Sequence, residues 1–202
     1  MHDALARMQT DANEALRNWS DRVLALVDGH LAGRHGTLDP QPLAGALAEA
    51  AYWSAAPHAR DVAGQATPYR RIPLAGHPAR GYEALLILWP PGHATPIHDH
   101  AGLWGIELVL DGVLEVEAFA LSLQQPAPRL VAGDRTMLGV GDHAAFSGTG
   151  YAHRCRNLSA QQPALSLHVY GGGLDAYRSF HRQADGDWVG IEQQARREPA
   201  LA

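Results

Sequence analysis

The chain has 202 residues, of which 46% are hydrophobic, so it is long and apolar enough to bury a sizeable core. A net charge of -5 with no block of like charges argues against nucleic acids and anionic membranes as partners. The single cysteine excludes an internal disulfide framework, and no apolar run approaches the length of a membrane span.

The N-terminal part of the chain is expected to be helical. Apolar residues recur mostly at three- and four-residue steps over residues 3–31, and Asp39 before Pro40 is suited to cap a second, shorter helix. Acidic residues interrupt the first segment, which lacks the apolar core of a secretory signal, so we expect a cytoplasmic protein. We expect one domain over residues 1–202, with the helical part, residues 1–55, packed outside a β barrel.

From Tyr69 onward the chain changes to short apolar runs separated by Gly, Pro and Asp, which is typical of a sandwich or barrel. Asp111-Gly112 is a strong hairpin signal, whereas residues 133–135 indicate a loop. We expect the barrel and a C-terminal extension over residues 69–192, with one more strand near Trp188 and a polar end that frays. The expected strands are Tyr69–Leu74, Tyr82–Trp89, Trp104–Leu110, Val113–Leu121, Thr136–Val140, His143–Phe146, His153–Leu158 and Ala164–Tyr170.

Two histidines, His98 and His100, follow a turn rich in proline and glycine and are separated by one residue. Side chains at i and i+2 of a strand point to the same side, so both imidazoles can hold one metal ion. A third ligand should arrive from another strand, and His153 is the best candidate. Because the chain has 12 histidines, a pair that arose by chance is the alternative.

The surroundings of these histidines resemble the two motifs of the cupin superfamily. The segment Gly92–Gly112 resembles the first motif, and the segment Gly141–Asn157, which contains His153, resembles the second. The chain departs from the pattern at two places. Gly105 lies near the usual position of a ligating glutamate in the first motif, and Gly148 replaces a proline in the second.

A second pattern follows in the strand expected over Ala164–Tyr170, where Ser166, His168 and Tyr170 alternate and therefore face one way. Upstream lie Tyr69-Arg-Arg71 and Ile87-Leu-Trp89. Together with the histidines, these segments resemble the thiol dioxygenases, and the cysteine dioxygenase branch in particular.

The resemblance implies a mainly β, jelly-roll-like cupin barrel that holds a non-haem ferrous ion, Fe(2+), through His98, His100 and His153. It also implies that a small thiol, most readily L-cysteine, is oxidised by O2 to its sulfinic acid. Ser166, His168 and Tyr170 would form a hydrogen-bonded relay beside the iron. The pocket would be formed by Arg71, which receives the substrate carboxylate, and by Tyr69, Ile87 and Trp89.

Several alternatives stay open at this point. Related 3-mercaptopropionate dioxygenases have glutamine where this chain has Arg71, and they carry a further arginine, for which Arg178 is a candidate in this chain. 3-Mercaptopropionate and mercaptosuccinate are therefore kept as alternative substrates. A non-catalytic cupin and a zinc enzyme are further interpretations. Glu107 is two residues after Gly105 and lies on the same side of the expected strand, so it can point inward. There it could pair with a cation such as Arg178 or reach the metal. Cys155 is expected to be a small buried residue, and with glycine at position 105 Tyr170 should stay unmodified.

Overall fold

A computed structural model describes residues 2–33, 38–51, 56–63, 68–74, 80–124 and 127–198. Within these ranges three helices come first: α1 (His2–Leu31), α2 (Gln41–Ala51) and α3 (Ala59–Val62). Eleven strands follow: β1 (Arg70–Pro73), β2 (Glu83–Trp89), β3 (Ile97–His98), β4 (Gly105–Asp111), β5 (Leu114–Ser122), β6 (Arg129–Leu138), β7 (His143–Phe146), β8 (Tyr151–Asn157), β9 (Ala164–Tyr170), β10 (Ala176–Arg182) and β11 (Trp188–Gln194).

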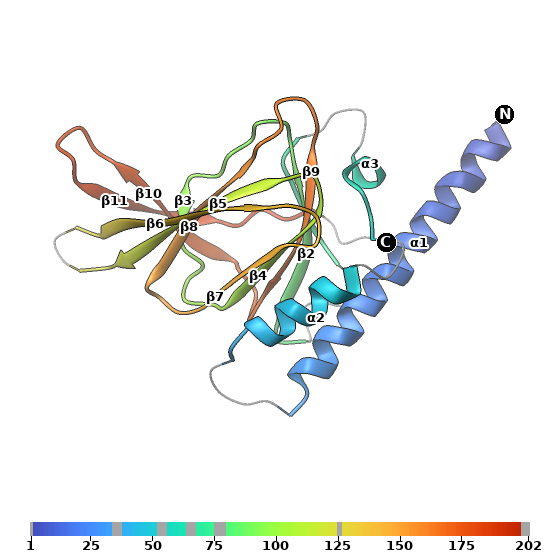
Figure 1. Cartoon of the computed structure of the whole chain (residues 1–202), viewed down its shortest axis with the longest axis horizontal. Helices are drawn as coiled ribbons and strands as arrows, with labels where there is room; N and C mark the ends of the chain where they lie inside the picture. Colours follow the sequence, from blue (N-terminus) through green and yellow to red (C-terminus); the bar gives the residue numbers. More distant parts are fainter. Residues whose placement is uncertain are drawn as a thin grey trace.

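The strands form two antiparallel sheets that face each other (Figure 1). The first sheet has the order β1-β2-β9-β4-β7, and the second has the order β11-β10-β3-β8-β5-β6. Neighbours in a sheet are often distant in sequence, as in a jelly roll, because the chain crosses repeatedly from one sheet to the other. The predicted mainly β, jelly-roll-like barrel with helices outside it is therefore confirmed.

The helices cover the outer face of the first sheet, where α2 lies between α1 and the strands (Figure 1). One buried cluster joins the helices to the outer face of this sheet. It contains Val23 and Val27 of α1, Leu43 and Leu47 of α2, and outward-facing residues of β2, β4 and β9 such as Leu108. The backbone N–H of Gln41 donates to the Asp39 carboxylate at 3.0 Å, so Asp39 caps α2 as predicted.

The central strands β2 and β9 are buried at all seven positions because both of their faces are covered. Leu86 and Leu88 of β2 face the helices, whereas the alternate residues Leu85, Ile87 and Trp89 face the second sheet. The same alternation in β9 turns three polar side chains toward the interior, and this interior holds the candidate site.

Three parts of the sequence prediction were wrong. Strand β6 includes residues 133–135, which were expected to be a loop, because this exposed edge strand pairs through its backbone and needs little apolar character. Strand β10, which lies between β11 and β3, was not predicted, because only two of its seven positions are buried and its sequence has little apolar character. The chain end was expected to fray, yet up to Glu198 it packs back onto β1, where the Glu198 N–H donates to the carbonyl of Arg71 at 3.0 Å.

None of the helices in the described ranges combines the length and the apolar character that crossing a bilayer requires.

Candidate metal centre and adjoining pocket

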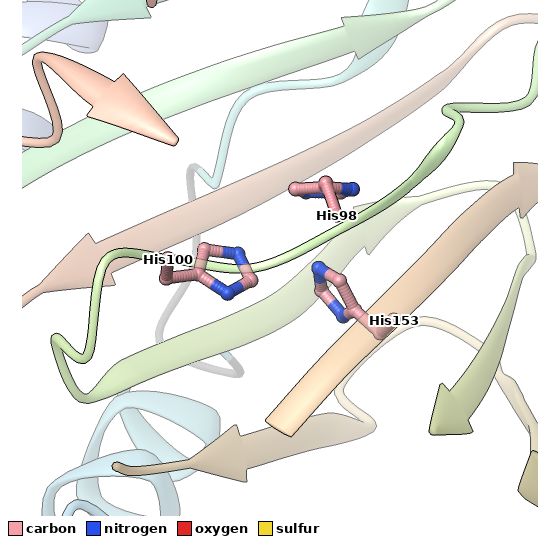
Figure 2. Close-up of side chains that lie close together, drawn as sticks. All are labelled: His98, His100 and His153. Atoms are coloured by element: carbon pink, nitrogen blue, oxygen red, sulfur yellow. The ribbon is translucent and has the colours of Figure 1, made fainter. Parts of the chain in front are cut away.

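The three histidines predicted as ligands meet inside the barrel (Figure 2). Strand β3 pairs with β8 in a register that puts His98 directly opposite His153. His100 follows in a tight turn, in which Ala101 and Gly102 have φ angles of 53° and 81°. The ring centroids lie 4.7–5.1 Å apart, and the nitrogens that face one another are all within 4.8 Å.

The burial of these rings favours the neutral form that metal binding requires. Burial lowers the pKa of His98 to about 4 and the pKa values of His100 and His153 well below the usual value. His98 Nδ1 lies 3.0 Å from the carbonyl of Pro96, so its Nε2 remains available. Both nitrogens of His100 and Nε2 of His153 are buried without a hydrogen-bond partner among the described residues. Unpartnered buried nitrogens are costly, and a divalent metal would satisfy them.

Tyr151 is a neighbour of the site that the sequence analysis missed. Its hydroxyl lies 3.3 Å from Nδ1 of His153, which directs Nε2 of that ring toward the other two histidines. Its ring stacks on Phe146 at 4.8 Å, and Phe146 in turn packs against His100. The signal was present in the sequence, because Tyr151 and His153 are two residues apart and share one side of β8.

Ser166, His168 and Tyr170 form a continuous hydrogen-bonded row on β9. Ser166 Oγ lies 2.9 Å from His168 Nε2, and His168 Nδ1 lies 3.0 Å from the hydroxyl of Tyr170. The row extends one residue further than predicted, since the indole N–H of Trp89 donates to Ser166 Oγ at 2.8 Å. Burial lowers the pKa of His168 to about 3, so this ring is neutral over the physiological range.

Gly105 gives the rings around Tyr170 the space they occupy. A Cβ at position 105 would lie 2.3 Å from the ring of Phe146 and 3.0 Å from that of Tyr170. Cys155, the single cysteine of the chain, is buried and free. An unmodified Tyr170 remains a prediction.

Arg71 and Arg70 point to opposite sides of β1. Arg70 pairs with Glu198 through its Nε at 2.7 Å, and both residues also reach the wall of the cavity described below. Arg71 lies opposite Ile87 in the register, and its Nε and Nη2 are buried with no hydrogen-bond partner among the described residues. Tyr69, on the same side as Arg71, stacks on His93 at 4.6 Å and meets Trp89 edge-on at 5.3 Å.

These groups line one cavity of about 570 Å³. Its wall includes two of the three histidines, His98 and His153, together with the relay residues His168 and Tyr170 and with Arg71. The C-terminal segment closes another side with Gln193, Gln194 and Arg196. The sequence did not predict that these residues line the cavity, because their position depends on the pairing of β10 with β11.

Glu107 also points into this cavity. It is 2% exposed, and its Oε1 lies 3.4 Å from His153 Nε2 and 3.5 Å from His168 Nδ1. Burial raises the pKa of Glu107 to about 8, while a hydrogen bond from Cys155 acts in the opposite direction. The pairing with Arg178 that we considered is wrong, because Arg178 lies beside Asp99 instead.

A protein-family model described as cysteine dioxygenase type I matches residues 42–183. Cysteine dioxygenase type 1 of Homo sapiens is 26% identical over 102 residues, which cover 50% of each chain, and that of Danio rerio is 24% identical, covering 50% of this chain and 51% of its own. The chain therefore spans about half the length of the curated relatives it matches.

Among solved structures, an oxalate oxidase in complex with the substrate analogue glycolate is 19% identical, with a TM-score of 0.40 and 52% and 50% of the two chains covered. A Cupin_2 domain of an XRE family transcriptional regulator from Enterobacter cloacae is 19% identical, with a TM-score of 0.38 and 50% and 94% covered. This likeness concerns the fold alone.

Proposed function

The chain belongs to the cysteine dioxygenase type I family, and from this premise we propose that it is a non-haem iron dioxygenase of small thiol carboxylates. L-cysteine is the substrate we favour. Both atoms of O2 are transferred to the sulfur, so that the thiol RSH becomes the sulfinic acid RSO2H, the second step of thiol oxidation. We further propose that the protein acts in the cytoplasm.

His98, His100 and His153 would hold the iron. Their imidazoles are neutral, so the three ligands add no negative charge to the centre. When bound, the ferrous ion supplies a positive charge and open positions at which a thiolate and O2 can meet.

Arg71 would orient the substrate by its carboxylate. Its buried Nε and Nη2 are donors without a partner, and a carboxylate accepts two such N–H groups in parallel. Burial raises the pKa of Tyr69, so its phenol stays protonated and can donate a hydrogen bond to the same ligand. A substrate held in this way presents its thiol to the histidines rather than to the mouth of the cavity.

Tyr170 would place a proton at the reacting end of the cavity. Burial raises the pKa of this phenol well above the usual value, so the hydroxyl remains a donor. His168 lies against its oxygen at 3.0 Å and fixes the ring position. A phenol held in this way can hydrogen-bond to oxygen as it is transferred to the sulfur.

The observation that carries this proposal is that His98 and His153 of the histidine set, the inner end of the relay, and Arg71, whose Nε and Nη2 lack partners among the described residues, line one cavity. A metal-storage or ligand-binding cupin has no need for a donor row beside its metal. The test is O2 consumption by iron-loaded protein with a panel of small thiols, together with mass spectrometry of the products. Absence of sulfinate with every thiol carboxylate would refute the proposal.

One observation favours a second candidate substrate within the same class. The wall of the cavity of about 570 Å³ carries Arg196 in addition to Arg71. A thiol dicarboxylate such as mercaptosuccinate would engage both arginines, whereas 3-mercaptopropionate and L-cysteine would engage one. The same panel separates these substrates by kcat/KM.

A further inference from the structure

The residues that follow β11 join the outer edges of the two sheets. Strand β11 is the outermost strand of the second sheet, and β1 is the outermost strand of the first. After β11, the Ala195 N–H donates to the carbonyl of Asp175 at 2.8 Å, and the Glu198 N–H donates to the carbonyl of Arg71 at 3.0 Å. Residues 195–198, which we call the C-terminal strap, therefore run from one sheet to the other, and they form part of the cavity wall on that side.

Arg197 anchors this strap. Its Nη2 donates to Oε2 of Glu83 at 3.0 Å, its Nε donates to Oε1 of the same carboxylate, and its Nη1 donates to Asp175 at 2.9 Å. Glu83 is fully buried at the start of β2, and its Oε2 also accepts the N–H of Leu174 at 2.9 Å. Two parallel bonds to a buried carboxylate hold a guanidinium in one geometry, so the strap is fixed at this residue.

A second ion pair of the strap is more exposed. Arg70 donates to Glu198 at 2.7 Å, but their side chains are 27% and 37% exposed, whereas the side chain of Glu83 is 0% exposed. Exposed ion pairs contribute little to stability, because water and salt screen them. Removing Arg197 should therefore release the strap, and removing Arg70 should not.

The strap matters for Arg71 because β1 is short and lies at the edge of its sheet. Strand β1 spans four residues and pairs with β2 on one side. Short edge strands open locally more readily than central ones. The Glu198 N–H holds the backbone of Arg71 from the other side, whereas Nε and Nη2 of the Arg71 guanidinium have no partner among the described residues. The position of this guanidinium therefore depends on how firmly its backbone is held.

We propose that Arg197 is a positioning residue, which acts through the strap to hold Arg71 where it receives the carboxylate of a thiol substrate. This inference rests on the carboxylate-binding role of Arg71 in the proposed function. The partners of Arg197 are Glu83 and Asp175, neither of which is a candidate metal ligand or a member of the relay. Loss of Arg197 should therefore affect the carboxylate end of the ligand and spare the metal.

The test measures ligand binding without turnover. Iron-loaded protein is titrated by calorimetry in the absence of O2 with L-cysteine and with cysteamine, which differs from it by the missing carboxylate. Arg197→Ala should bind L-cysteine roughly two- to thirtyfold more weakly than the wild type, with cysteamine affinity and iron content unchanged. Arg135→Ala is the matched control, because Arg135 pairs with another buried glutamate, Glu117, away from the cavity lining. It should leave both affinities unchanged.

A second variant guards against a failure to fold. Arg197→Ala leaves Glu83 buried without its cation, which is costly to the fold. Glu83→Gln/Arg197→Ala removes both charges and still releases the strap, so it should show the same loss of L-cysteine affinity. Wild-type affinity for L-cysteine in this double variant would overturn the inference.

A double-mutant cycle shows whether Arg197 acts through Arg71. Once Arg71→Gln has removed the carboxylate receptor, adding Arg197→Ala should weaken L-cysteine binding no further, with Glu83 either intact or replaced. Additive losses would mean that Arg197 contributes in another way, and they would overturn the inference. A wild type that binds L-cysteine no more tightly than cysteamine would do the same.

Hydrogen exchange provides a readout that needs neither metal nor ligand. The amides of β1 should exchange faster in Arg197→Ala than in the wild type and in Arg135→Ala, and equal exchange would contradict the role of the strap. If loaded protein oxidises no thiol but the binding cycle and the exchange rates behave as expected, the dioxygenase proposal fails and the positioning role stands. If sulfinate forms but the losses are additive, only the role of Arg197 is rejected.

Discussion

Replacing Arg71 with glutamine should weaken substrate binding and stabilise the free protein at the same time. In the free protein the guanidinium is buried, and its Nε and Nη2 lack hydrogen-bond partners among the described residues. Leaving buried donors unsatisfied costs about 1–3 kcal/mol. Glutamine removes the charge, so the free variant should unfold at a higher temperature than the wild type.

Substrate binding should change in the opposite direction. A hydrogen bond between charged partners contributes about 1.5–3 kcal/mol, so losing one raises KM by roughly ten- to a hundredfold. The loss should appear with L-cysteine and 3-mercaptopropionate. Cysteamine has no carboxylate, and its KM should hardly change.

Arg70→Gln is the matched control, because Arg70 is the adjacent residue of β1 and its guanidinium is already paired with Glu198. Sulfinate formation is measured with all three thiols in the wild type and both variants. If Arg71→Gln and Arg70→Gln raise KM equally, or if cysteamine is affected as much as cysteine, the assignment of Arg71 as carboxylate receptor is refuted.

Three further predictions concern the interior. His153→Ala should lose most of the iron under anaerobic loading, as seen by elemental analysis; full iron occupancy would refute the ligand set. Tyr170→Phe should keep its iron and lose roughly a hundredfold in kcat, and the intact mass of the wild type should show no loss of two hydrogens. In metal-free protein Glu107 stays protonated in the fold up to about pH 8 but ionises above about 4.5 when unfolded. The contribution of Glu107 to stability should therefore fall as pH rises between these values, on the order of a few kcal/mol, and it is measured as the difference between the denaturation curves of the wild type and Glu107→Leu.

The local rules of strand geometry predicted the parts of the site that lie within one strand. The row on β9 follows from the i, i+2 relation along a strand. The same relation predicted that His98 and His100 lie together, but β3 ends at His98, and the turn that follows brings His100 to it. His153 required the spacing of the second motif, because its pairing with His98 is a contact between distant strands. The resemblance to a family supplied this long-range information, which no periodicity contains.

The parts that the sequence did not reveal depend on register between distant strands. Glu107 has the parity of an inward residue, but its distance from His153 depends on how the two sheets face each other. The C-terminal wall depends on β10 and β11, whose exposed positions carry little apolar signal. Arg178 has a plausible position in the sequence, yet the turn of the chain places it beside Asp99.

The direction of the relay follows from Trp89, which the sequence analysis treated only as a wall of the pocket. An indole N–H can donate but cannot accept, so Ser166 Oγ must accept from it. The hydroxyl proton of Ser166 is then best used on Nε2 of His168, which puts the proton of that neutral ring on Nδ1. Nδ1 donates to the oxygen of Tyr170, and the phenolic proton of Tyr170 is left to point into the cavity. The opposite direction would leave the Ser166 proton without an acceptor among the described residues, so one donor-only side chain orients the whole row toward the cavity.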